Sequence, residues 1–350
     1  MNQITDAAYI RQMLKACLEI PSPCGDTEEI SQFLKKELES MGIETRVTNK
    51  GAIIGILPGE KEGFSRMVSA HVDTLGAMVK RIKDNGRLRL ENVGGYSWTS
   101  VEGENVRVKT REGKIFTGTL MPERASVHCF PEDAREEERT ADIMEVRLDE
   151  ETQSKEETLE LGIRSGDFVS FETRTVFTES GYIKSRYLDD KACVAALLDA
   201  CRSLTASGVK PVRTTYVYFT NYEEIGHGIS KIPEDTAEIL ALDIGTVAEG
   251  YESDEHCVSI CAKDAKTPYD FRLRRLLENL CETEDIPGRT DLYYRYGSDA
   301  SAAILQNVDA RCGCIGPGVD ATHHYERTHE DAIVNTARLL TAYLLTDTPK

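Results

Sequence analysis

The sequence lacks any run of about 20 apolar residues, the length an α-helix needs to cross a membrane. Its first residues, MNQITDAAYIRQMLK, also lack the basic stretch followed by an apolar one that marks a secretory signal peptide. These absences argue against a membrane span and a membrane partner. We therefore expect the chain to stay in the cytoplasm.

The sequence also has no excess of basic over acidic residues. The chain has 42 Lys and Arg against 60 Asp and Glu, which gives a formal net charge of -18 at pH 7. A nucleic-acid-binding protein normally presents a basic face to neutralise phosphates, so nucleic acid is not an expected partner. An acidic protein instead attracts metal cations or basic substrates.

The ten cysteines lack the spacing of a disulfide framework, because only Cys312 and Cys314 are close neighbours. Cys17, Cys193 and Cys201 fall at apolar positions of helical patterns, where a free cysteine behaves as a small buried hydrophobe. We expect reduced, structural thiols, as is usual in the cytoplasm.

The order of the patterns predicts an α/β domain with an insertion. Helical and strand patterns alternate up to about residue 75 and again from about residue 171, whereas the region between shows short alternating runs broken by glycine. We expect residues 1–75 and 171–350 to form one α/β domain, with a mixed central sheet flanked by helices. Residues 76–170 are expected to form a small inserted β domain.

Local signals add smaller expectations. Asp26 followed by Glu29 resembles a capping box for a helix that stops at Gly42, and the acidic runs PEDAREEER and LDEETQSKEETLEL suggest solvated faces or short helices. Ser298 or Asp299 suits the cap of the SAAILQ helix, although this segment could also form a wall of a substrate pocket. The cluster of Tyr293, Tyr294 and Tyr296 either lines an entrance or is packing.

Acidic and histidine residues recur where predicted strands end. They are His71 with Asp73, Asp189 with Asp190, Glu223 with Glu224, Asp243, and the histidines of GPGVDATHHYERTHE. Each is weak evidence alone. Together they indicate a site, because ligands of open α/β sheets bind at strand ends.

This set suits a pair of divalent cations, which lie about 3.5 to 4 Å apart and need a bridging carboxylate with further nitrogen and oxygen ligands. Alternate residues of a strand point the same way, so we expect Asp73 to accept the second N–H of the His71 imidazole and fix its tautomer. The side chains of Glu223 and Glu224 diverge. One can bind metal while the other reaches a bridging water.

The order of these motifs resembles that of the tetrahedral aminopeptidase family, over essentially the whole chain. The motifs are His71-x-Asp73, Arg186-x-x-Asp189-Asp190-Lys191, Glu223-Glu224-x-Gly226, Leu242-Asp243, Gly297-Ser298-Asp299-Ala300 and Thr322-His323. That family includes glutamyl and deblocking aminopeptidases, and its members are often labelled endoglucanase M. The resemblance implies a phosphorylase/hydrolase-like aminopeptidase fold whose insertion is a small β-barrel.

The resemblance also implies the roles of the site residues. The metal ligands would be His71, Asp189, Glu224, Asp243 and His323. Asp189 would bridge the two ions and be joined to Asp190 by a cis peptide, with His71 and Asp243 completing one ion and Glu224 and His323 the other. Glu223 would be the general base, and Asp73 would support His71.

By the same resemblance, the cofactors would be two divalent metal ions per subunit, zinc first, with cobalt or manganese as alternatives. The substrates would be short peptides with a free N-terminus. Self-assembly through the β insertion would give a homo-oligomer, a twelve-subunit tetrahedron in the family, although a dimer stays open. The preferred N-terminal residue is also open.

The chain departs from the family pattern in places. Thr74, Lys191 and His227 replace the usual neighbours of three motifs, and none of these changes removes a ligand. The common His-Ser-Pro run is here His323-His324-Tyr325-Glu326. We favour His323 as the last ligand, because it directly follows the segment that approaches the site, and keep His324 and His329 as alternatives.

Three other functions are alternatives. A related two-metal carboxypeptidase, dipeptidase or N-acyl amino acid deacylase would use the same carboxylates, but would place its insertion between later motifs. A glycosidase needs two carboxylates and no histidine ligands. A non-catalytic oligomeric scaffold is the third alternative, and its metal content would distinguish it.

Overall fold

The computed structural model describes residues 5–229 and 231–348, which form two compact units. One unit holds the described residues up to Asp73 together with those from Arg174 onward, and the other is Thr74–Thr173. The predicted insertion, residues 76–170, falls within the second unit.

The first unit is built on a twelve-stranded mixed sheet with the path β1-β2-β12-β3-β13-β17-β18-β11-β10. Strands β14 and β15 also pair with β17, and β16 pairs with β15. The strands are β1 (Glu44–Val47), β2 (Ile53–Leu57), β3 (Lys61–His71), β10 (Val176–Phe177), β11 (Tyr182–Ser185), β12 (Arg213–Thr220), β13 (Thr236–Leu242), β14 (Gly245–Val247), β15 (Val258–Lys263), β16 (Gly288–Leu292), β17 (Arg311–Asp320) and β18 (Glu326–His329). The four neighbours β12, β3, β13 and β17 run parallel at its centre. The predicted mixed α/β sheet is confirmed.

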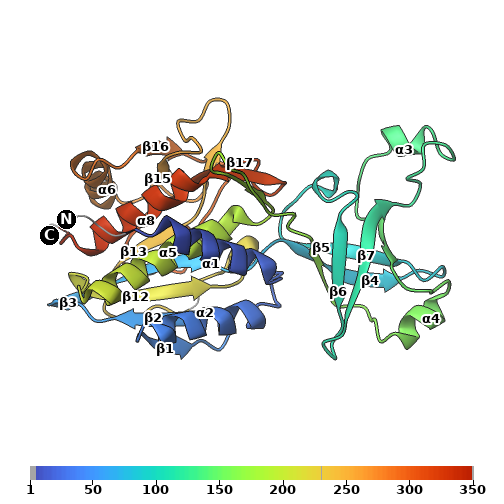
Figure 1. Cartoon of the computed structure of the whole chain (residues 1–350), viewed down its shortest axis with the longest axis horizontal. Helices are drawn as coiled ribbons and strands as arrows, with labels where there is room; N and C mark the ends of the chain where they lie inside the picture. The colour runs from blue at the N-terminus through green and yellow to red at the C-terminus, as the bar shows by residue number, and fades with distance from the viewer. Residues whose placement is uncertain (1–4, 230, 349–350) are drawn as a thin grey trace. The chain divides into compact units, whose positions relative to one another are not determined.

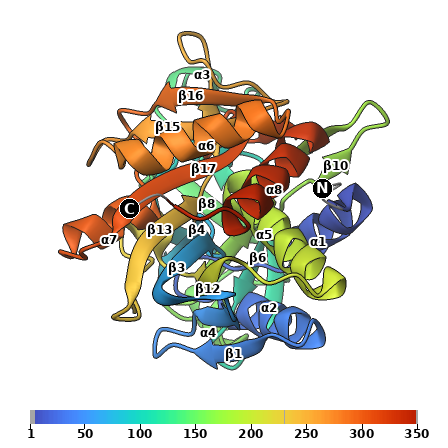
Figure 2. The same ribbon diagram turned by 90° about the vertical axis from the view of Figure 1, so that its left-hand side faces the viewer.

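Helices cover both faces of this sheet (Figures 1 and 2). They are α1 (Ala7–Glu19), α2 (Glu28–Ser40), α5 (Leu188–Ser207), α6 (Phe271–Thr283), α7 (Asp299–Leu305) and α8 (Glu330–Leu344). Figure 1 shows α1, α5 and α8 side by side, and the contacts between them agree. Figure 2 shows α7 on the opposite side of the central strands. The apolar residues of α5 are buried almost throughout, because this helix lies between the sheet and its neighbours.

The second unit is a closed six-stranded antiparallel barrel in the order β4-β5-β8-β7-β6-β9. Its strands are β4 (Gly76–Ile82), β5 (Leu88–Val93), β6 (Asn105–Lys109), β7 (Ile115–Pro122), β8 (Met144–Leu148) and β9 (Phe168–Phe171), with the 3-10 turn η1 (Trp98–Ser100) and the short helices α3 (Asp133–Glu136) and α4 (Lys155–Glu160). Alternate strand residues and the single tryptophan, Trp98, fill the interior. The inserted small β-barrel is therefore confirmed.

Within the part of the chain that the structure describes, no helix has both the length and the apolar character needed to span a bilayer. The ten cysteines are free thiols, and only Cys129 is exposed.

Candidate active site

The predicted site residues meet at the carboxyl edge of the four parallel strands. His71 is the last residue of β3 and pairs in register with Thr220, the last residue of β12. Glu223 begins the 3-10 turn η2 (Glu223–Ile225) that follows β12, and Asp243 directly follows β13. His323 lies just beyond the end of β17. This edge is where ligands bind in open α/β sheets, so the fold itself gathers these side chains.

Asp189 enters the same place from the start of α5. Asp189 and Asp190 have non-helical backbone angles, and the peptide bond between them is cis. Asp190 Oδ2 accepts a hydrogen bond from the main-chain N–H of His71 at 3.1 Å. The two neighbouring carboxylates thus separate: Asp190 fixes the end of β3, and Asp189 faces the site.

The two carboxylate oxygens of Asp189 face different histidines. Oδ1 lies 3.0 Å from His71 Nε2, and Oδ2 lies 3.5 Å from His323 Nε2. His323 Nε2 is also 3.4 Å from Glu224 Oε2. A carboxylate that bridges two metal ions needs this arrangement, with one oxygen directed to each of the two ligand groups.

Asp243 completes the group around His71. Its ligand oxygen lies within 4.8 Å of ligand atoms of both His71 and Asp189. The Asp243 carboxylate is buried, and the buried Glu224 Oε1 atom has no hydrogen-bond partner among the described residues. Buried carboxylate oxygens without partners are costly, and divalent cations would satisfy them. The donor set therefore fits divalent cations.

Burial and mutual repulsion dominate the electrostatics of the acidic side chains. Burial raises the pKa of Glu224 to about 7, and burial followed by repulsion from nearby carboxylates raises the pKa of Glu223 and of Asp243 well above their ordinary values. Burial lowers the pKa of His71, but its hydrogen bond with Asp189 and the surrounding acids outweigh this and raise it. Concentrated negative charge of this kind attracts cations.

Asp73 does not hold His71 in the predicted way. The His71 Nδ1 atom lies 3.0 Å from the main-chain oxygen of Asp73 and 3.7 Å from its carboxylate Oδ1. The carboxylate instead accepts hydrogen bonds from the N–H groups of Glu223, at 3.1 Å, and Glu224, at 3.2 Å. The structure thus corrects this prediction: Asp73 positions the two glutamates.

Glu326 is a site residue that the sequence did not reveal. Its buried carboxylate accepts from the main-chain N–H of His323 at 3.0 Å and from that of Asp189 at 3.1 Å. Burial raises the pKa of Glu326 to about 8. A single side chain therefore ties together two residues that are remote in sequence. The only signal was its place in the run that begins at His323.

The two alternative histidines lie elsewhere. His324 is exposed, and its Nδ1 atom accepts from the main-chain N–H of Tyr325 at 2.8 Å. His329 is the N-cap of α8, where its side chain accepts from the N–H of Asp331. Of the three candidates, His323 is the one placed against the carboxylates.

Three segments that carry site residues pass through left-handed backbone conformations. Tyr187 (φ 65°) precedes the paired aspartates, Tyr222 (φ 68°) precedes the paired glutamates, and His323 itself has φ 61°. Each such residue costs about 1–3 kcal/mol and persists only where surrounding contacts enforce it. These contacts include the hydrogen bonds made by Asp73 and Glu326.

A cavity of about 480 Å³ opens beside this group. Its lining includes Lys266 and Arg295 together with the site residues Asp189, Glu223, Glu224, Asp243 and His323. Neither cation has an ion pair with a described residue. The cavity lining therefore carries both acidic and basic side chains.

The structure also decides between the two interpretations given for the tyrosine cluster and for the segment around Ser298. Tyr293 and Tyr296 line it, whereas Tyr294 is exposed and stacks on Tyr251. Ser298 is the N-cap of α7 and forms a capping box with Ser301, so the structural interpretation of this segment is confirmed. Gly297 also lines the cavity, as the alternative expected.

Known proteins resemble this chain over most of its length. Residues 51–339 match the family described as M42 glutamyl aminopeptidase. YhfE of Bacillus subtilis, whose name gives it as an aminopeptidase, is 45% identical over 342 residues, which cover 97% of this chain and 99% of that one.

Solved structures share the fold. An aminopeptidase of Desulfurococcus kamchatkensis superposes with a TM-score of 0.86 at 22% identity, covering 97% of this chain and 95% of that one. The TET1 peptidase of Pyrococcus horikoshii, described as able to assemble into a tetrahedron or a large octahedral shell, gives a TM-score of 0.81 at 24% identity, covering 96% and 99% of the two chains.

Proposed function

The chain belongs to the M42 glutamyl aminopeptidase family, a metal-dependent family, and we propose that it is a co-catalytic metalloaminopeptidase acting on short peptides. The observation that carries the proposal is the Asp189 carboxylate, with one oxygen toward His71 and the other toward His323. That geometry supports sites for two ions.

One ion would be held by His71, Asp189 and Asp243, and the other by Asp189, Glu224 and His323. Such ions lower the pKa of water and polarise a carbonyl oxygen when they are bound. Zinc is the first expectation, and cobalt and manganese suit the same nitrogen and oxygen ligands. The main-chain oxygen of Asp73 orients His71, and Glu326 holds the backbone on both sides of the site.

Glu223 is the proposed general base. Its Oε2 atom lies 3.9 Å from His71 Nε2, it lines the cavity, and Asp73 fixes its main chain. From this position the carboxylate can take a proton from the attacking water and pass it to the amine that leaves. Buried surroundings favour the protonated form of the carboxyl, which suits a group that must hold a proton between two steps.

Lys266 and Arg295 support a preference for an acidic residue at the peptide N-terminus. Both line the cavity without an acidic partner among the described residues, so a substrate carboxylate can pair with them. Basic N-terminal side chains would meet like charge there. Specificity of this kind arises as much from repulsion as from attraction.

We also propose an oligomeric state and a cellular compartment for this protein. A homo-oligomer, with the tetrahedral dodecamer as its proposed form, is supported by the tetrahedron and the large octahedral shell described for TET1 of Pyrococcus horikoshii. The ten free thiols fit a reducing compartment, so we propose the cytoplasm. The deacylase, dipeptidase and scaffold alternatives gain no support from the family match.

The test is a panel of aminoacyl-p-nitroanilides with acidic, basic and apolar side chains, offered with a free or an N-acetylated amine to protein loaded with zinc, cobalt or manganese. We expect turnover of free-amine substrates only, with the acidic ones preferred. Lys266→Ala combined with Arg295→Ala should reduce that preference while turnover of apolar substrates continues.

Glu223→Gln is the control for the chemistry. It should lower kcat about 10²–10⁴-fold or more, because general acid–base catalysis is lost, while metal content stays unchanged. Turnover of acetylated substrates alone would support the deacylase instead. An unaffected Glu223→Gln variant would exclude this residue as the base.

A further inference from the structure

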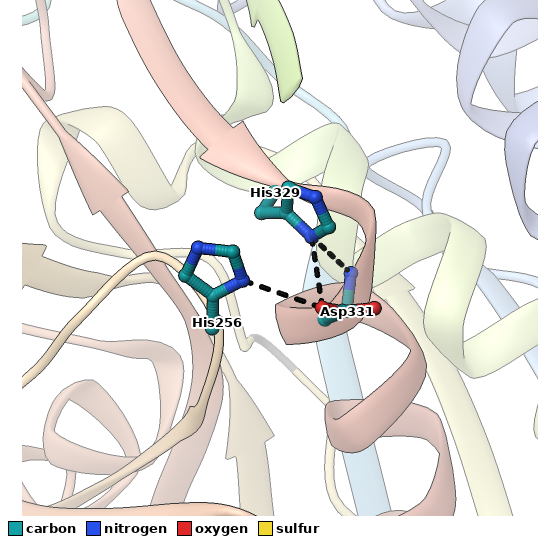
Figure 3. Close-up of side chains that lie close together, drawn as sticks. All are labelled: His256, His329 and Asp331. Carbon is teal, nitrogen blue, oxygen red and sulfur yellow. Dashed lines mark hydrogen bonds and ion pairs between the residues drawn. The ribbon is translucent and has the colours of Figure 1, made fainter. Parts of the chain in front are cut away.

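We propose that His256, His329 and Asp331 form a further binding site for a transition-metal divalent cation such as zinc, apart from the active-site group. Figure 3 shows the three side chains converging from the loop before β15, the end of β18 and the first turn of α8. Their ligand atoms all lie within 4.8 Å of one another. None of the three belongs to the set proposed for catalysis.

The convergence involves one particular nitrogen of each imidazole. His256 Nδ1 lies 3.3 Å from Asp331 Oδ2, and His329 Nδ1 lies 3.1 Å from the same oxygen. Two ligands on a tetrahedral zinc ion, each about 2.0–2.1 Å from the metal, are about 3.3 Å apart. The two nitrogen–oxygen distances thus match those of ligands sharing one ion.

The other ring nitrogens are directed to oxygen acceptors. His329 Nε2 lies 2.9 Å from the main-chain oxygen of Ser180, and His256 Nε2 lies 3.4 Å from Tyr182 Oη. A hydrogen on each Nε2 leaves the Nδ1 lone pairs available. Histidine ligands in metal sites typically donate their second N–H to a carbonyl or another oxygen in this way.

With these tautomers, the Nδ1 lone pair of His329 lies against the Asp331 carboxylate, and the two repel each other. If Nε2 of neutral His329 carries the hydrogen, its Nδ1 lone pair faces the Asp331 carboxylate at 3.1 Å. A cation between them removes this repulsion. The N–H of Asp331, which lies 3.2 Å from His329 Nδ1, shares that lone pair in the N-cap of α8, so the ion would replace it as the partner.

The surrounding chain is shaped to hold the rings. Tyr182 packs edge-on against both imidazoles, with centroid distances of 5.8 Å to His256 and 5.1 Å to His329. Gly181 has φ 85°, and a Cβ atom there would lie 2.3 Å from His329 Nε2. A glycine at this turn therefore lets the β10–β11 hairpin reach the imidazole.

Two opposing effects bear on a cation here. The N-terminus of α8 carries the positive end of the helix dipole, which disfavours a cation. Glu330 and Asp331 occupy the first turn, and Asp331 itself contributes a negative ligand. Half of each of the His256 and Asp331 side chains is exposed, so the remaining coordination positions are open to water.

A bound ion would join three segments that are far apart in sequence. It would fasten the loop before β15 to β18 and α8, and through Ser180 and Tyr182 to the β10–β11 hairpin. Because β18 begins at Glu326, which supports the active site, the ion would stabilise the strand behind the catalytic group. We assign it a structural role.

The test is the metal content per chain after equilibrium dialysis of the full-length protein against excess zinc and gel filtration into metal-free buffer. Four proteins are compared: wild type, His256→Ala, Asp331→Asn and His128→Ala. The last removes an exposed histidine outside the cluster. We expect His256→Ala and Asp331→Asn each to hold one ion fewer than wild type, and His128→Ala to match it.

The deciding result is the difference in metal content between each variant and wild type. It does not depend on how many ions the active site holds. Aminopeptidase activity of each variant reports that the chain is folded. Zinc should also raise the thermal midpoint of wild type by more than it raises that of His256→Ala. Equal metal content in wild type and both cluster variants would overturn the proposal.

Discussion

The side chains proposed as ligands could be predicted because each lies at or after the end of a strand and carries a recognisable chemistry. The order of motifs identified His71, Asp189, Asp243 and Glu224 before any geometry was known, and the structure brings them together. The partners that orient them could not be predicted. Every residue has a main-chain carbonyl, so the role of the Asp73 carbonyl leaves no signal in the sequence.

Glu326 offers a test at the residue scale. Glu326→Gln leaves one acceptor oxygen where two main-chain N–H groups now donate, so the backbone at Asp189 or His323 must shift. We expect metal affinity to fall about 10–100-fold, the usual effect of losing an outer support of metal ligands. Isothermal titration with zinc measures it.

A matched control for this variant is Glu60→Gln, which changes an exposed glutamate outside both proposed metal sites. Its metal affinity should equal that of wild type. If Glu326→Gln also bound zinc as tightly as wild type, Glu326 would have no positioning role.

At the scale of elements, periodicity was a reliable guide and capping was less so. Cys17, which was predicted at an apolar position of a helical pattern, is a buried residue of α1. The expected capping box of Asp26 and Glu29 is wrong, because α2 begins at Glu28 with Thr27 as its N-cap. The Thr27 hydroxyl accepts from Asn221 instead of capping the helix, a tertiary contact that local sequence cannot show.

The ends of β13 and β17 give a prediction for close strand packing. A Cβ atom on Gly316 would lie 2.0 Å from the main-chain oxygen of Asp243, whereas one on Gly313 would meet only the side chains of Leu273 and Leu240 at 3.0 Å or more. Gly316→Ala should therefore displace the backbone of a proposed ligand, and Gly313→Ala should not.

We expect Gly316→Ala to destabilise the protein by about 1–3 kcal/mol, the usual cost of overpacking, and to reduce activity. Urea unfolding and the hydrolysis assay measure the two effects. Equal activity in the Gly316→Ala and Gly313→Ala variants would show that the Asp243 backbone does not need this close approach.

For the whole molecule, the sequence predicted the class and the insertion, because alternating periods of 3.6 and 2 change at its boundaries. The resemblance to the tetrahedral aminopeptidases is confirmed by the family match. The strand order was beyond reach. Nothing local states that β2 pairs with β12 and not with β3, since that choice depends on packing across the sheet.

Stability without metal should depend on pH. Burial raises the pKa of Glu224 to about 7 and of Glu326 to about 8, and the net effect on His71 is also upward. A folded state with raised pKa values binds more protons than the unfolded state, so its stability is greatest below the unfolded pKa and is lost as pH rises. The chelated protein should lose stability between pH about 5 and about 8.

Metal should weaken this dependence, because bound cations favour the ionised carboxylates that ligate them. Thermal midpoints of chelated and zinc-loaded protein across that interval provide the measurement. A chelated protein that gained stability as pH rose would contradict the assignment of buried, proton-binding carboxyls to this site.

The central claim is that Asp189 bridges two ions. X-ray diffraction from zinc-loaded crystals, recorded on either side of the zinc absorption edge, locates bound zinc directly. We predict two anomalous peaks flanking the Asp189 carboxylate, one beside His71 and Asp243 and the other beside His323 and Glu224. A single peak there, or none, would contradict the account.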